Sequence, residues 1–168
     1  MVIRVTKFVV VLACALVGAT TNGAQFPPIA FLSIGFKEAT MVDFASSPQV
    51  SARRADASGY LAVSADFDGD GEVDEARVLL NEQRKVAYVV AVIQSPSKVD
   101  TYVLSQMPLE DAKNVGITLA KPLEVNQSRG LCGVKIFALD SGQGEASYFD
   151  GEEFNTQVTV AATPAKAS

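Results

Sequence analysis

An alternating run near the middle of the chain places the strongest constraint on its fold. Residues 86–93 read VAYVVAVI, so both sets of alternate side chains are apolar. A strand that is apolar on both faces needs neighbouring strands at its edges and cover on each face. The sequence therefore predicts that residues 86–93 form a central strand of a β-sheet.

Shorter segments surround this run and have the apolar, β-branched and aromatic content of strands. They are residues 60–65, 75–80, 100–105 and 134–139. Polar turns are predicted at residues 81–85 and at Ser95-Pro96-Ser97. Asp150-Gly151 predicts a tight type I′ hairpin turn, and the alternating residues 154–160 would form the strand that follows it.

Helical periodicity is weak throughout the chain. Residues 107–114 could form one or two helical turns, residues 29–36 a strand, and residues 44–57 a loop or a short helix. We therefore predict a mainly β protein with a single antiparallel β domain over residues 25–160, either a sandwich or a strongly curled sheet. Residues 161–168 are small and polar and are expected to form a flexible tail.

The first residues have the pattern of an export signal. Arg4 and Lys7 precede an apolar run at residues 8–17. This run of about 10 residues is shorter than the roughly 20 that a membrane-spanning helix requires. We expect residues 1–24 to be a cleaved signal peptide, with no membrane span after processing.

Two small residues offer cleavage sites, after Ala19 or after Ala24. Cys14 lies inside the apolar run rather than after it, which disfavours processing as a lipoprotein. The mature protein is therefore expected to be secreted or periplasmic.

Composition excludes several classes of function. Loss of Arg4 and Lys7 leaves 12 basic and 19 acidic side chains, a net charge of −7. This balance argues against nucleic acid or an anionic membrane as partner, since both require basic patches. The chain contains no histidine, which removes Ser-His-Asp, Cys-His and HExxH chemistries. We therefore expect a protein that is not an enzyme.

Cys132 would be the only thiol left after removal of Cys14. Such a cysteine is most often a buried small apolar residue. The alternative is a disulfide that joins two chains through Cys132.

The main candidate site is an acidic loop. Residues 66–77 read DFDGDGEVDEAR, with acids at positions 1, 3, 5 and 9 and glycine at position 6. Calcium loops use this spacing because alternate side chains converge on the ion and glycine permits the reversal. Two carboxylates about 4 Å apart repel by roughly 4 kcal/mol at an effective dielectric near 20, so the curled loop needs a cation. The predicted ligands are Asp66, Asp68, Asp70, the backbone carbonyl of Glu72, and Asp74. The alternative is an ordinary solvated acidic turn.

The loop departs from a full EF-hand loop at its twelfth position. Arg77 stands where the bidentate glutamate would be, and Glu75 is two places early. We therefore expect weak binding, with micromolar to millimolar dissociation constants, and a structural site. Predicted strands on both sides favour strand–loop–strand over an EF-hand or dockerin, in which a helix follows the loop. A calcium-dependent interaction module of that kind is an alternative.

The stretch ADFDGDGEVD, from Ala65 to Asp74, resembles the integrin α-chain propeller repeats and the related FG-GAP and VCBS repeats of bacterial surface proteins. The resemblance covers about residues 59–93 and implies calcium ligation by the five residues named above. A propeller needs several repeats and this chain has one, so the propeller fold is not implied. The chain is also similar to small bacterial exported proteins with a single such loop.

These features predict an exported, non-enzymatic calcium-binding β domain with a binding or scaffolding role. The expected partner is another exported protein or a surface glycan, and an inhibitor or accessory subunit is a further alternative. A carboxylate-based hydrolase or lyase with a calcium-stabilised fold is the enzymatic alternative, for which the candidate acids are Asp43, Asp100, Asp140 and Asp150.

Overall fold

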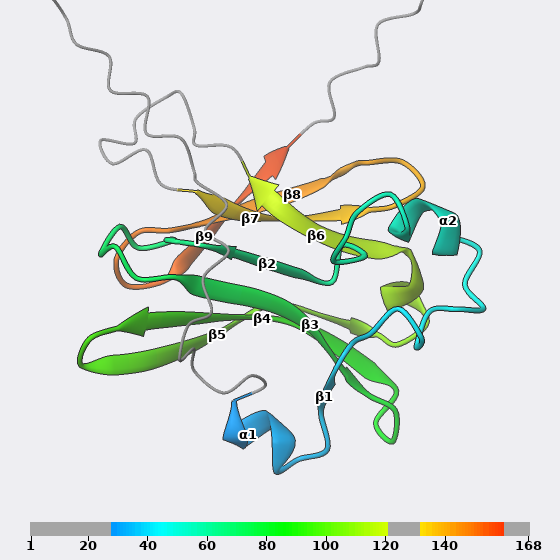
Figure 1. Cartoon of the computed structure of the whole chain (residues 1–168), viewed down its shortest axis with the longest axis horizontal. Coiled ribbons are helices and arrows are strands. Elements are labelled where there is room, and N and C mark those ends of the chain that lie inside the picture. Colours follow the sequence, from blue (N-terminus) through cyan, green and yellow to red (C-terminus); the bar gives the residue numbers. More distant parts are fainter. Residues whose placement is uncertain (1–27, 121–131, 160–168) are drawn as a thin grey trace, which may run out of the picture.

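The computed structural model describes residues 28–120 and 132–159. Two antiparallel β-sheets pack face to face, and the core lies between them (Figure 1). The first sheet has the order β1 (Lys37–Glu38), β3 (Asp74–Asn81), β4 (Val86–Ser95) and β5 (Lys98–Pro108), and β2 (Ala62–Ala65) also pairs with β3. The second sheet contains β6 (Val115–Ala120), β7 (Gly133–Ala138), β8 (Gly144–Phe149) and β9 (Phe154–Thr159) in chain order. The predicted mainly β, antiparallel fold is confirmed, in the form of a sandwich.

The central strand is β4, as the alternating run predicted. It pairs with β3 on one side and β5 on the other. One face contributes Ala87, Val89 and Ala91 to the core between the sheets, where Ile117 and Val134 of the second sheet meet them. Burial on this inner face is the main source of stability, because each fully buried aliphatic side chain contributes about 1.5–3 kcal/mol.

The outer face of β4 is covered by the segment that contains α1 (Ile29–Leu32). Phe31 and Phe36 pack on Tyr88, with ring centroids 6.2 and 4.6 Å away. The prediction of a strand at residues 29–36 is therefore wrong. The chain makes a short helix and then a turn, and Gly35 allows this turn with a φ of +86°. Both phenylalanines thereby reach the same tyrosine.

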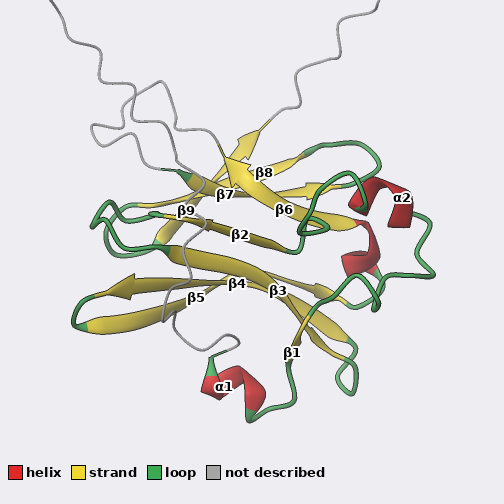
Figure 2. Ribbon diagram, viewed as in Figure 1, coloured by secondary structure: helices red, strands yellow, loops and turns green. Residues whose placement is uncertain are grey.

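Other predicted elements are confirmed with adjusted bounds. Strands were expected at 60–65, 75–80, 100–105 and 134–139, and they correspond to β2, β3, β5 and β7. The expected helix at 107–114 is reduced to the 3₁₀ turn η1 (Asp111–Asn114), because Met107 and Pro108 still pair with β4. A short helix, α2 (Val50–Arg53), lies within the segment 44–57 (Figure 2).

The hairpin near the C-terminus is confirmed, but its predicted turn type is wrong. Phe149 pairs with Phe154, so four residues form the turn. A type I′ turn requires positive φ at both Asp150 and Gly151, and only Gly151 has it, at +112°. The Asp150 carboxylate instead accepts hydrogen bonds of 2.9 Å from the backbone N–H groups of Glu152 and Glu153. This side-chain capping stabilises a longer turn.

Cys132 lies in the core immediately before β7, with 4 % of its surface exposed. The burial agrees with the sequence, but the sulfur takes part in a disulfide bond, where a thiol was favoured. Cys14, the candidate for lipid attachment, lies outside the described residues.

The predicted signal peptide, with Ala19 and Ala24, and the predicted tail 161–168 also lie outside the described residues. Within residues 28–120 and 132–159, no helix has both the length and the apolar character needed to cross a membrane.

Candidate metal centre

The acidic loop joins two neighbouring strands of the first sheet. β2 ends at Ala65 and β3 begins at Asp74, and these two residues face each other across the antiparallel pair. The chain between them forms a compact loop at one end of the sandwich (Figure 2). The predicted strand–loop–strand arrangement is confirmed, so this loop is not followed by the helix of an EF-hand.

A buried aromatic side chain fixes the orientation of the loop. Phe67 is fully buried in the core and meets the ring of Phe154 edge-on at 6.2 Å. Phe67 is buried, whereas Asp66 and Asp68 on either side of it are only partly buried and each direct a carboxylate oxygen to a shared point.

Three carboxylates converge at this point. Asp66, Asp68 and Asp74 each offer an oxygen, and these oxygens all lie within 4.8 Å of one another. Two unit charges at that separation repel by about 3.5 kcal/mol at an effective dielectric of about 20. A divalent cation among them would convert this repulsion into attraction.

Backbone hydrogen bonds hold the loop in this curled form. Asp66 accepts from the N–H groups of Gly69 and Gly71, at 2.6 and 3.0 Å. Both glycines have positive φ, +81° and +93°, and a Cβ at Gly71 would meet no atom within 4 Å. Glycine is therefore favoured at position 71 by its backbone conformation and not by a lack of space.

Asp74 is the most constrained of the three acids. It has no exposed surface, and it accepts hydrogen bonds from the backbone N–H groups of Phe67 (2.7 Å) and Gln94 (2.8 Å). Burial raises its pKa to about 7, with smaller contributions from Asp68 and Asp66, although the two N–H donors act in the opposite direction. A cation at the site would favour the ionised form and offset the cost of burial.

Asp68 is also perturbed. Burial raises its pKa, and the neighbouring charges of Asp70 and Asp66 act in the same direction. Two of the three converging carboxylates are thus held where their negative charge is unfavourable without a counter-ion.

The structure does not bring all five predicted ligands together. Asp70 is exposed, and its carboxylate accepts a hydrogen bond from the N–H of Glu72 at 2.8 Å instead of joining the three oxygens. Ligation by Asp70 and by the Glu72 carbonyl stays a prediction.

Glu75 and Arg77 lie on the outer face of β3, away from the core. Asp74 and Ala76 are on the inner side, so the intervening Glu75 and the next residue, Arg77, are on the outer side. Arg77 pairs there with Glu75 and with Glu38, at 2.8 and 2.6 Å. Neither side chain faces the three carboxylates, as the departure from the EF-hand pattern suggested.

Gln94 is a site residue that sequence reasoning missed. It lies near the end of β4, where its backbone N–H donates to Asp74 and its side-chain amide donates to the Val73 carbonyl at 3.1 Å. These bonds depend on the pairing of β3 with β4, and no local motif marks them.

The acids considered for catalysis occupy separate places. Asp43 pairs with Lys37 and accepts a hydrogen bond from the N–H of Thr40, while Asp100 pairs with Lys98 at 2.6 Å. Asp150 caps its own turn. Over the described ranges, the three aspartates of the loop are the one group of potential metal-ligating side chains that converge in this way.

No protein-family model matches this sequence, and no curated protein or solved structure matches it.

Proposed function

We propose that this protein is an exported, calcium-stabilised β-sandwich domain with a binding or scaffolding role rather than an enzymatic one. Asp66, Asp68 and Asp74 would hold the ion in the loop between β2 and β3. Asp70 and the carbonyl of Glu72 are expected to complete the shell when the ion is bound. The signal pattern of residues 1–24 supports export, and the lack of histidine, the commonest general base, argues against an enzymatic role.

The metal proposal rests mainly on one observation. Three carboxylates converge within 4.8 Å, and one of them is fully buried. A solvated acidic turn would let its side chains separate into water. Here Phe67 and the backbone bonds to Asp66 and Asp74 keep the charges close together. This arrangement is costly unless a cation binds.

The ligand chemistry favours calcium. All the proposed donors are hard oxygens, which suit calcium better than softer metals. Calcium accepts six to eight oxygens in a flexible geometry, whereas magnesium demands a near-ideal octahedron. The missing glutamate at position 77 implies weak binding, which suits an environment rich in calcium.

A thermal melt with and without calcium tests the proposal. At a calcium concentration 100 times the dissociation constant, binding stabilises by about 2.7 kcal/mol. We expect the melting temperature to rise by roughly 5–10 °C relative to the metal-free protein. Asp68→Ala should remove this rise.

Glu72→Ala is the matched control. It removes an exposed acid from the same loop but leaves the backbone carbonyl that is expected to bind the ion. The calcium-induced rise should therefore persist in this variant. If calcium does not change the melting temperature of the unmodified protein, the proposed metal site is refuted.

A further inference from the structure

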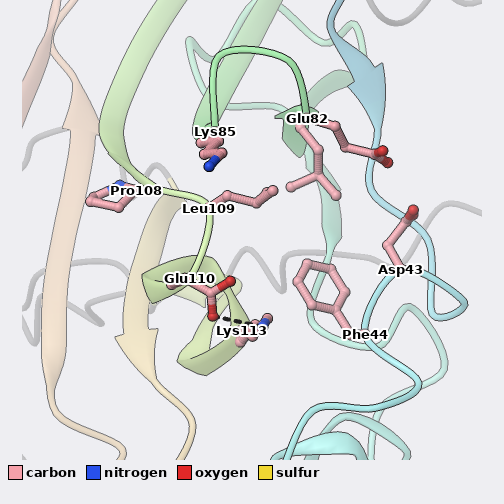
Figure 3. A pocket seen from close by; sticks show the side chains of 9 residues that line it. Asp43, Phe44, Glu82, Lys85, Pro108, Leu109, Glu110 and Lys113 are labelled. Atoms are coloured by element: carbon pink, nitrogen blue, oxygen red, sulfur yellow. Dashed lines mark hydrogen bonds and ion pairs between the residues drawn. The ribbon is translucent and has the colours of Figure 1, made fainter.

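A cavity lies at the end of the first sheet, between the β3–β4 turn, the segment after β5 and the chain before α2. Its volume is about 580 Å³, within the range of about 300–1,000 Å³ that is typical of small-molecule sites. Figure 3 shows the side chains that line it. The apolar part of the lining consists of Phe44, Leu80, Pro108 and Leu109.

The aromatic wall of this cavity is held in place by a buried arginine. Arg53 has no exposed surface, and its guanidinium lies over the Phe44 ring at 4.1 Å. The same group donates hydrogen bonds to the backbone carbonyls of Gly59 (3.0 Å), Ala112 (2.8 Å) and Val115 (2.8 Å). Phe44 is therefore fixed before any ligand arrives, which lowers the entropic cost of binding.

Charged side chains surround the apolar lining, and most of them are already paired. Asp43 and Glu82 share Lys37, at 2.7 and 2.6 Å. Glu110 pairs with Lys113 at 2.6 Å (Figure 3). Lys85 is the exception, because its ammonium group has no ion-pair partner within residues 28–120 and 132–159.

The backbone at Lys85 has an unusual conformation. Lys85 is the last residue of the turn between the paired residues Asn81 and Val86, and its φ is +54°. Glycine and asparagine are favoured in this left-handed region, whereas a longer side chain costs free energy there. The backbone N–H of Leu109 donates to the Lys85 carbonyl at 2.9 Å and fixes the turn against the cavity wall. Strained backbone conformations cluster at functional sites, and Lys85 lies on the lining of this cavity.

We propose that this cavity binds a small organic carboxylate with an apolar body. The body would lie against Pro108 and Leu109, over the almost fully buried Phe44 and Leu80, and the carboxylate would pair with the ammonium group of Lys85. The three acids Asp43, Glu82 and Glu110 are matched in number by the lysines Lys37, Lys85 and Lys113, and Lys85 is the one of these lysines with no ion-pair partner among the described residues. This site is separate from the acidic loop, and its occupation does not depend on the metal.

The test compares two probes that differ in charge. Naphthoate has an aromatic body and one carboxylate, and naphthylmethanol has the same body without the charge. Binding to the full chain in excess calcium would be measured by NMR titration and by calorimetry. We expect naphthoate to bind about tenfold more tightly, because one charge-assisted hydrogen bond accounts for a difference of this size.

Lys85→Gly separates binding from folding. This variant removes the ammonium group and relieves the positive φ, so the melting temperature should stay the same or rise while the preference for naphthoate disappears. Arg84→Ala is the matched control, since Arg84 carries the same charge in the same turn and does not line the cavity. It should leave both affinities unchanged.

Leu109→Trp would place a bulkier side chain in the cavity and should weaken both probes. The proposal is overturned if neither probe binds, if the two bind equally well, or if Lys85→Gly keeps the preference for naphthoate. It is also overturned if Leu109→Trp leaves both affinities intact, because the probes would then bind elsewhere.

Discussion

In the metal-free protein the free energy of unfolding is expected to depend on pH, because the Asp74 carboxyl has no exposed surface. Burial raises the pKa of this carboxyl from 3.8 to about 7 in the folded chain. Between these two values the folded protein holds a proton that the unfolded chain has released. The free energy of unfolding therefore falls as the pH rises through this window, and it changes no further above it.

The size of the effect follows from the shift. Each pKa unit corresponds to 1.36 kcal/mol, so the roughly two units between pH 5 and the folded pKa amount to about 3 kcal/mol of lost stability by pH 8. For a domain of this size the melting temperature should fall by about 8 °C. Bound calcium favours the ionised carboxylate, so the stabilisation by calcium should be larger at pH 8 than at pH 5.

Urea unfolding followed by circular dichroism at several pH values measures this directly. Metal-free protein would be prepared with buffers treated by a chelating resin, and each series would be repeated with calcium. Asp74→Asn removes the titrating group, so the difference between the two metal-free chains isolates it from other ionisable groups. If both chains show the same pH dependence, or if calcium leaves it unchanged in the unmodified protein, the reasoning is wrong.

Three further substitutions test neighbouring parts of the structure. Asp70→Ala should reduce calcium affinity less than Asp68→Ala does, measured by calorimetry, because the Asp70 carboxylate lies outside the converging group. Phe67→Ala should lower the free energy of unfolding by about 3–5 kcal/mol in urea and also weaken calcium binding, since the buried ring orients the loop. Arg53→Met should lower the free energy of unfolding by about 3 kcal/mol or more in the same assay, because three backbone carbonyls lose their donor. An unchanged urea midpoint in Phe67→Ala or in Arg53→Met would contradict the role given to that residue.

The features that the sequence predicted well are those set by local patterns. Residues 86–93 are apolar on both faces, and such a strand has few positions other than the centre of a sheet. The acidic loop was also predictable, because the spacing of Asp66, Asp68 and Asp74 brings their oxygens together once glycine permits the curl. Both depend on residues close together in the chain.

The strand β6 was missed, and β8 was implied only by the hairpin turn that follows it, because small residues in both strands resemble loop sequence. A Cβ at Gly116 of β6 would lie 3.0 Å from the Cβ of Tyr60, and one at Gly144 of β8 would lie 2.0 Å from the carbonyl oxygen of Ile136. These glycines are strand residues because another segment packs closely against them. That contact is tertiary, so a local pattern cannot show it.

The proposed ion would act on more than its own loop, because the residues around it connect both sheets. Asp74, the first residue of β3, accepts hydrogen bonds from Phe67 in the loop and from Gln94 in β4, so it links β3 to both. Phe67, between two proposed ligands, packs against Phe154 of the second sheet, whose ring also contacts Tyr102 of β5. Without the ion the three carboxylates would repel one another, and this repulsion would act on a loop anchored by a buried ring that packs between the two layers. This mechanical connection favours a structural role for calcium, because a sensor would place its ligands where the chain can move without disturbing the core.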